Sequence, residues 1–286
     1  MRPAQLSSRI FLDSGDPEDT KKILATMGFL DGQTTNPTLL SKNPEIVKKK
    51  LEGKITKEDI FPLYKDVIQE ISSLIPNGSV SVEIFADMQT SKDEMLEQAN
   101  QMYAWVPNAH LKFPILPEGL NAAHAFSLDG KRVNMTLCFT QDQGAAVYTA
   151  TSTSKRGDVF LSPFVGRLDD IGINGISLIQ NVLTMYKESD GHVEVLAASI
   201  RSVEQLMAAL AIKCDILTVP YPVLSAWIER GMPMPDQTFS YDTKGMQEIP
   251  YKELSLADPY TTFNIEHPLT TKGIEKFSQD INTLFG

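Results

Sequence analysis

Short apolar runs alternate along the chain with longer stretches in which apolar residues recur every three or four positions. The short runs are typical of buried strands, and the longer stretches are typical of amphipathic helices. The strand-like runs lie at residues 9–13, 29–33, 80–85, 109–115, 132–139, 159–162, 193–198 and 216–219. Eight strands separated by helices predict an α/β protein with a (β/α)8 TIM barrel. The alternative is a doubly wound open sheet, but no glycine-rich phosphate loop follows the first run.

Local signals predict where several helices begin and end. Asp16 followed by Pro17 predicts a helix start, and Gly28 predicts the end of that helix. A longer helical stretch is predicted from 38 to 74, with a break near Gly53. In a capping box, a Ser or Thr caps the helix and an acidic or amide side chain three residues later bonds back. This pattern occurs at residues 91–94, 140–143 and 202–205.

The pattern weakens after the eighth strand. Prolines at 233 and 235 break any helix, and residues 239–259 form an irregular polar stretch. Apolar residues return at helical spacing in 272–285, which predicts an amphipathic terminal helix that adds a helical segment to the barrel. We therefore expect a single domain over 1–286, with the barrel at roughly 9–220 and a C-terminal extension at 221–286.

Composition narrows the functional classes. A formal charge of -10 argues against a general binder of nucleic acids or anionic membranes. We find no signal-peptide core and no apolar stretch of spanning length, and the two cysteines, Cys138 and Cys214, lie in apolar runs. These features predict a cytoplasmic protein with reduced, buried thiols and small-molecule partners, and they leave a homo-oligomer open. An anionic substrate would need local basic groups to offset the charge of the chain.

Lys112 lies within the apolar run at 109–115. Burying an ammonium group is costly, so its amine should be paired or partly neutral. A neutral lysine amine can attack a carbonyl carbon and form a Schiff base. The alternative is a lysine at a strand end whose side chain reaches solvent.

Polar residues recur where the predicted strands end. In a barrel of this class the carboxyl ends of the strands form the active face. The residues are Asp13, Asn36, Glu83, Lys112, Asn134, Thr136, Ser162, Arg167, Ser199 and Arg201. Each alone has an ordinary explanation, such as a turn, an outward strand face or a surface ion pair. Their recurrence at one end of the barrel favours a site.

Four of these residues suit carbonyl chemistry. If Lys112 attacked a ketone, the resulting carbinolamine would have to lose water. Glu83, with Thr136 holding a water molecule, could deliver the proton for that step. The iminium would stabilise a carbanion on the adjacent carbon, and Asp13 could remove the proton from the hydroxyl beyond it.

The remaining residues suit a phosphorylated sugar. Amide and hydroxyl groups can bond sugar hydroxyls, and guanidinium groups can bind phosphate in a bidentate manner. The candidates for the hydroxyls are Asn36, Asn134 and Ser162, and those for the phosphate are Arg167, Ser199 and Arg201.

Seven segments together resemble the transaldolase family. They are residues 11–15 (FLDSG), 34–39 (TTNPTL), 82–83 (VE), 111–114 (LKFP), 134–137 (NMTL), 161–167 (LSPFVGR) and 198–201 (ASIR). The resemblance covers roughly 9–220. It implies a (β/α)8 barrel that transfers a dihydroxyacetone unit between sugar phosphates, with no metal and no organic cofactor.

The resemblance also implies residue roles. The Schiff-base lysine of the family falls on Lys112, and its acid–base aspartate falls on Asp13. The glutamate and threonine that hold the catalytic water fall on Glu83 and Thr136. The substrate-binding positions fall on Asn36, Asn134, Ser162, Phe164, Arg167, Ser199 and Arg201.

Two positions bear on the reaction. Related barrels that cleave fructose 6-phosphate to free products carry glutamine at the glutamate position and tyrosine at the phenylalanine position. Here these residues are Glu83 and Phe164, which resembles the transferase. The implied donors are sedoheptulose 7-phosphate and fructose 6-phosphate, and the acceptors are glyceraldehyde 3-phosphate and erythrose 4-phosphate, in the pentose phosphate pathway. An aldolase that releases dihydroxyacetone and a non-catalytic sugar-phosphate-binding barrel stay open.

Overall fold

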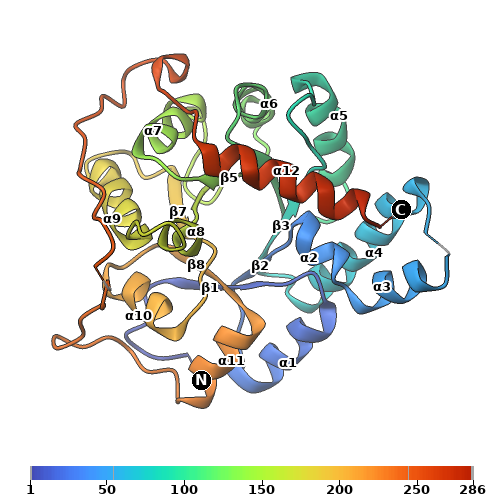
Figure 1. Ribbon diagram of the computed structural model, residues 1–286, viewed down its shortest axis with the longest axis horizontal. Coiled ribbons are helices and arrows are strands. Elements are labelled where there is room, and N and C mark those ends of the chain that lie inside the picture. The colour runs from blue at the N-terminus through green and yellow to red at the C-terminus, as the bar shows by residue number, and fades with distance from the viewer. Residues whose placement is uncertain (1, 54, 244, 285–286) are drawn as a thin grey trace.

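The parallel strands of the protein close into a barrel in which each strand pairs with the next along the chain and β8 pairs with β1 (Figure 1). The computed structural model describes residues 2–53, 55–243 and 245–284. The strands are β1 (Arg9–Asp13), β2 (Gly32–Thr34), β3 (Ser79–Glu83), β4 (Ala109–Pro114), β5 (Val133–Cys138), β6 (Val159–Pro163), β7 (Val193–Ala197) and β8 (Ile216–Pro220). The predicted (β/α)8 class is confirmed.

Helices connect successive strands and form the outer layer (Figure 1). They are α1 (Pro17–Met27), α2 (Pro37–Ser41), α3 (Pro44–Leu51), α4 (Lys57–Leu74), α5 (Lys92–Tyr103), α6 (Pro117–Leu128), α7 (Gln141–Ala150), α8 (Val165–Asp169), α9 (Gly175–Tyr186), α10 (Val203–Ala211), α11 (Tyr221–Glu229) and α12 (Pro268–Asn282), with a 3-10 turn η1 (Tyr260–Thr262). Among the described residues, no helix combines the length and apolar character needed to cross a membrane. Both cysteines are buried thiols, as predicted.

Two predicted boundaries are wrong near the second strand. β2 begins at Gly32, not at residue 29, because Leu30 packs in the core from the preceding loop without joining the sheet. The helical stretch predicted from 38 onward is interrupted a second time, at Asn43. Its side-chain oxygen accepts hydrogen bonds from the backbone N–H groups of Glu45 and Ile46 and so starts α3.

Two of the predicted capping boxes are confirmed, at Ser91 and Thr140. The third is only half right. Ser202 caps α10 by accepting from the Gln205 N–H. The Gln205 side chain does not return this bond, because its Oε1 accepts from the backbone N–H of Arg201 at 2.7 Å. The glutamine therefore anchors a residue of the predicted phosphate site.

The C-terminal segment returns to the barrel. Figure 1 shows α12 crossing the face of the barrel, from the side of α7 to α2. Thr270 donates to the Leu137 carbonyl at the end of β5 at 2.9 Å, and Thr38 of α2 donates to Asp280. The predicted apolar face of this helix is buried through Ile274, Phe277 and Ile281, and Leu284, just after the helix, is buried as well. The helix extends from 268 to 282, and Phe285, the predicted last residue, lies outside the described residues.

Candidate active site

The predicted polar residues gather around one cavity of about 300 Å³ at the carboxyl ends of the strands. The predicted residues that line it are Asp13, Asn36, Lys112, Thr136, Ser162, Phe164, Arg167, Ser199 and Arg201. Glu83 and Asn134 do not line it, but each contacts a residue that does. The barrel therefore brings the whole predicted set together.

Lys112 points into the barrel, and its side chain is only 5% exposed. The explanation as a solvent-reaching lysine is therefore wrong. Its Nζ lies 2.7 Å from Glu83 Oε2 and donates to the Thr35 carbonyl oxygen at 3.0 Å. The strand register explains the pairing, because Glu83 of β3 and Lys112 of β4 are direct neighbours in the sheet.

Burial dominates the electrostatics of both carboxyl groups. It raises the pKa of Glu83, against the opposing effects of Lys112 and Arg167. It also raises the pKa of Asp13, against the opposing effects of Lys112 and of the Thr34 hydroxyl, which donates to Asp13 Oδ1 at 2.7 Å. The Lys112 amine therefore lies beside a carboxyl group whose pKa is raised by burial.

Thr136 supplies an unpaired hydroxyl group. Its Oγ1 is buried and has no hydrogen-bond partner within the part of the chain that the structure describes. Because the residue lines the cavity, this hydroxyl is available to a water molecule or to a substrate oxygen. The next residue, Leu137, has a φ of 62°, which is unusual for a bulky residue other than glycine. The end of β5 is thus bent where Thr136 enters the site.

A chain of hydrogen bonds crosses the barrel interior below the cavity. Ser162 donates to Asn134 Oδ1 at 2.7 Å, and Asn134 donates to Ser81 Oγ at 3.1 Å. Asn134 bonds to side chains inside the barrel and Thr136 lines the cavity, so the outward-facing alternative for this face of β5 is wrong. Asn36 uses its side-chain oxygen to cap α2, accepting from Leu39 N–H at 2.9 Å. Its amide nitrogen, which has no part in this cap, can donate to a substrate.

Two arginines make part of the cavity basic. The Arg167 guanidinium is held between two aromatic rings, with its central carbon 5.0 Å from the Phe164 centroid and 5.4 Å from the Phe277 centroid. Arg201 follows β7, its side chain is 48% exposed, and it pairs with Asp170. Of the two arginines, Arg201 is therefore the one in a surface ion pair. Local cations thus offset the net charge of the chain at this site.

A family model described as Transaldolase/Fructose-6-phosphate aldolase matches residues 10–286. The chain belongs to this family. The match includes the C-terminal segment, so α12 is part of the family's extent.

Named relatives agree with this placement, and one solved structure shares the fold. A protein of Dehalococcoides mccartyi named "Probable transaldolase" is 39% identical over 243 residues, which cover 84% of this chain and 100% of the relative. A protein of Brucella anthropi with the same name is 35% identical over 78% of this chain and 90% of the relative. A crystal structure from Mesorhizobium loti aligns with a TM-score of 0.50 at 10% identity, over 77% of this chain and 56% of that one. That likeness shows the fold alone.

Sequence reasoning missed several residues of this transaldolase/fructose-6-phosphate aldolase family site. The missed cavity residues include Thr34, Lys42, Thr218 and Phe277. The two threonines extend the Asp13 interaction, because Thr218 Oγ1 lies 2.6 Å from Thr34 Oγ1 and, with the Thr34 hydrogen given to Asp13, must be the donor. Phe277 could have been found from the apolar face of the predicted terminal helix, but its place over Arg167 requires the fold.

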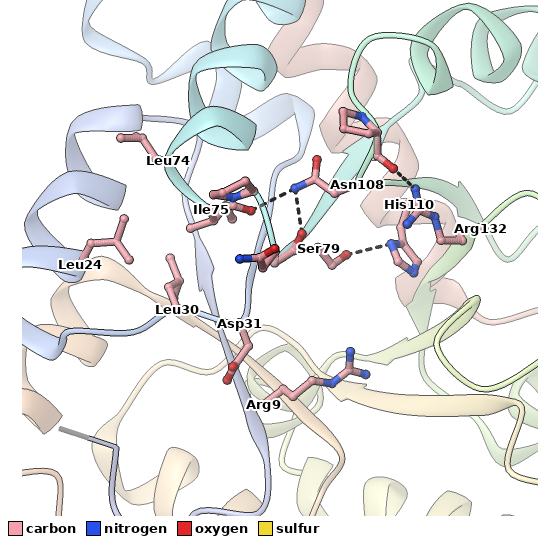
Figure 2. A pocket seen from close by; sticks show the side chains of 14 residues that line it. Arg9, Leu24, Leu30, Asp31, Leu74, Ile75, Ser79, Asn108, His110 and Arg132 are labelled. Carbon is pink, nitrogen blue, oxygen red and sulfur yellow. Dashed lines mark hydrogen bonds between the residues drawn. The ribbon is translucent and has the colours of Figure 1, made fainter.

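A larger cavity, of about 660 Å³, opens at the amino-terminal end of the barrel, opposite the candidate active site. Figure 2 shows Leu24, Leu30 and Leu74 on one side of it and polar residues on the other. Most of these polar groups already have partners in the fold: Arg9 with Glu194, Asp31 with Arg2, His110 with Ser79 and Gly157, and Asn108 with the carbonyls of Ile75 and Gly78. Such pairing is typical of the amino-terminal face of a barrel, which stabilises the fold.

Proposed function

We propose that this protein is a transaldolase that transfers a dihydroxyacetone unit from a ketose phosphate to an aldose phosphate through a Schiff base on Lys112. One observation carries the proposal. The Lys112 amine is buried 2.7 Å from a carboxyl group of raised pKa, in a cavity that also holds Arg167 and Arg201. The donors are sedoheptulose 7-phosphate and fructose 6-phosphate, and the acceptors are glyceraldehyde 3-phosphate and erythrose 4-phosphate.

The covalent step begins at the amine. Glu83 takes the ammonium proton, and the neutral Lys112 nitrogen attacks C2 of the ketose. The attacking nitrogen then gives one of its protons to the C2 oxygen, which yields a neutral carbinolamine. Glu83 then returns a proton through a water molecule held by the Thr136 hydroxyl, and the C2 oxygen leaves as water. The product is an iminium ion. The unpaired Thr136 hydroxyl and the contact of Glu83 with Lys112 support these roles.

The cleavage step needs a base. Asp13 removes the proton of the C4 hydroxyl, the C3–C4 bond breaks, and its electron pair moves into the iminium to form an enamine. The C4 fragment leaves as an aldehyde. The acceptor aldehyde then takes the reverse path, with Asp13 returning its proton to the new hydroxyl, and hydrolysis frees the lysine.

Substrate recognition follows from the neutral and cationic groups. Asn36, Asn134 and Ser162 serve the sugar hydroxyls. Arg167, Arg201 and Ser199 bind the phosphate, as guanidinium groups favour planar, bidentate contacts. Phe164 has no hydroxyl group that could protonate the enamine, which supports transfer to an acceptor over release of dihydroxyacetone. We further propose that the protein acts in the pentose phosphate pathway and is located in the cytoplasm.

Mass mapping of a borohydride-reduced adduct tests this function. Fructose 6-phosphate and borohydride should label the protein at Lys112 with a reduced sugar fragment, and Lys112→Ala should abolish the label. Labelling of the alanine variant would overturn the assignment of the nucleophile. Ligand binding without any label would show a non-catalytic sugar-phosphate-binding barrel.

A second assay separates the transferase from the aldolase. Fructose 6-phosphate alone should release little dihydroxyacetone, and erythrose 4-phosphate should start rapid turnover. Dihydroxyacetone release that is as fast without an acceptor as turnover is with one would show an aldolase.

A further inference from the structure

Tyr64 of α4 reaches into the barrel wall next to Lys112. Its side chain is fully buried, with the ring packed against Phe85 and Trp105 at centroid distances of 5.6 Å and 5.7 Å. Its hydroxyl group lies 2.5 Å from Thr35 Oγ1 and accepts a hydrogen bond from the Glu83 backbone N–H at 3.0 Å. The helix layer therefore supplies a polar atom to the strand ends that carry the site.

The directions of these hydrogen bonds are fixed. Thr35 Oγ1 donates its single hydrogen to the Ser81 carbonyl at 2.9 Å. The Tyr64 hydroxyl must therefore donate to Thr35 Oγ1, because a threonine hydroxyl has one hydrogen. The circuit runs in one direction, from Glu83 N–H through Tyr64 and Thr35 to Ser81. It joins α4, the residue that follows β2, and β3.

These hydrogen bonds fix Thr35 and Glu83, which are the two residues that contact the Lys112 amine. The Thr35 carbonyl oxygen accepts from Lys112 Nζ at 3.0 Å, and Glu83 Oε2 lies 2.7 Å from the same nitrogen. Thr35 is also pinned through its backbone N–H, which donates to Ser81 at 3.1 Å. The Tyr64 hydroxyl is bonded to both of these residues at once, so it sets their positions relative to each other.

We propose that Tyr64 is a positioning residue that fixes the Lys112 amine for attack on the substrate, through the Thr35 peptide group and the Glu83 backbone. This role rests on the proposed Schiff-base function. Tyr64 does not line the cavity, so its loss should slow the covalent step without weakening the binding of the sugar phosphate. A residue that merely stabilises the fold would not separate these two effects.

Tyr186 offers a matched control. It is also buried, and its hydroxyl donates to the Gly144 carbonyl at 2.7 Å, between α9 and α7 and away from the cavity. Tyr64→Phe and Tyr186→Phe each remove one buried hydroxyl from one satisfied set of hydrogen bonds. A similar decrease in melting temperature in both variants would measure the loss of stability caused by removing a buried hydroxyl. Only Tyr64→Phe should lower the rate of adduct formation.

The experiment follows the time course of adduct formation with fructose 6-phosphate, quenched with borohydride and read by intact-mass spectrometry. For Tyr64→Phe, the limiting rate should fall about ten- to a hundred-fold, because small displacements of a reacting group are costly. The half-saturating concentration should stay unchanged, and Tyr186→Phe should match the wild type. Equal rates for the two tyrosine variants would overturn the proposal. A wild type that forms no adduct would instead refute the proposed function.

Thr35 gives an independent arm. Thr35→Val breaks the same circuit, so its rate should fall by a similar factor, and the double variant with Tyr64→Phe should be no slower than either alone, since the residues act as one unit. Thr35→Ser keeps the hydroxyl and should recover much of the rate lost in the valine variant. Additive losses, or a serine variant as slow as the valine variant, would contradict the circuit. This arm also decides the question if Tyr64→Phe does not fold.

Discussion

Asp13 shows how single neighbours adjust a buried carboxyl group. Burial raises its pKa, while the charge of Lys112 and the hydrogen bond from Thr34 act in the opposite direction. Thr218 in turn orients the Thr34 hydroxyl. One charge and one short chain of hydroxyl groups therefore limit the rise in the pKa of the proposed base.

Thr34→Val should move the acidic limb of the pH profile of kcat to higher pH. The substitution removes a hydrogen bond that stabilises the carboxylate, so the pKa of Asp13 rises further, and a base must be deprotonated to act. Thr34→Ser keeps the hydroxyl and should leave the limb near its original position. An unchanged limb in the valine variant would remove Asp13 from the role of base.

Asp13→Asn should stabilise the protein at neutral pH by about 1 kcal/mol, because it removes a carboxyl group whose charged form is destabilised by burial. The pKa of Asp13 is raised in the folded state. The folded state therefore binds the proton more tightly, and stability falls as pH rises through the interval between the unfolded and folded pKa values. The gain measured by urea unfolding should shrink as pH is lowered towards the ordinary range of a carboxyl group. A gain that does not depend on pH would contradict this linkage.

The residues at strand ends could be predicted because a barrel places them all at one face. Lys112 and Glu83 followed from this rule, and so did Asn134. Tyr64 could not be predicted, because its partners lie far from it in sequence and it reaches them from a helix. Its apolar ring gives the sequence pattern of an ordinary core residue.

At the scale of elements, α12 completes the cavity. Phe277 lines it and covers the Arg167 guanidinium. Gly273 allows this close approach, because a Cβ atom there would lie 2.6 Å from Arg167 Nη1 and 2.6 Å from Leu137 Cδ2. The terminal helix therefore positions the Arg167 guanidinium, which is the proposed phosphate-binding group.

Gly273→Ala should raise the KM for phosphorylated ketoses about ten-fold, because the added methyl group displaces the Arg167 guanidinium. The KM for a non-phosphorylated ketose should change much less. Lys272→Ala, at the exposed neighbouring position, is the control and should leave both constants unchanged. Equal effects of Gly273→Ala on both substrates would show a general loss of the site.

Elements were predictable where capping residues mark their ends, as in α1. Elements were not predictable where tertiary packing determines their bounds or their existence. β2 is short because the preceding apolar residues enter the core from a loop. α11 was missed because no side chain caps it, and it is held by the packing of Trp227, whose indole N–H donates to the Pro233 carbonyl at 2.9 Å.

At the scale of the molecule, local charge opposes net charge. The chain carries a formal charge of -10, yet the cavity is lined by Arg167, Arg201 and the exposed Lys42. Arg167 is held under α12, whereas Lys42 faces solvent. Salt screens exposed charges far more than buried ones, so the two should differ in their dependence on ionic strength.

Lys42→Gln should raise the KM for sugar phosphates about two- to five-fold at low salt, and this effect should fade at high salt. Arg167→Gln should raise the KM at both salt concentrations. Lys65→Gln makes the same change in net charge at an exposed position of α4 outside the cavity and should have little effect. If Lys65→Gln matched Lys42→Gln, the net charge of the chain would govern binding.

The two ends of the barrel differ in role: the amino-terminal end stabilises the fold, and the carboxyl-terminal end holds the candidate active site. β1 and β3 begin at Arg9 and Ser79, beside the cavity of Figure 2, and end at Asp13 and Glu83, beside the candidate active site. Asn77 is exposed at the first of these ends. If the protein were immobilised on a solid support through residue 77, the candidate active site would face away from the support and stay open to the surrounding solution.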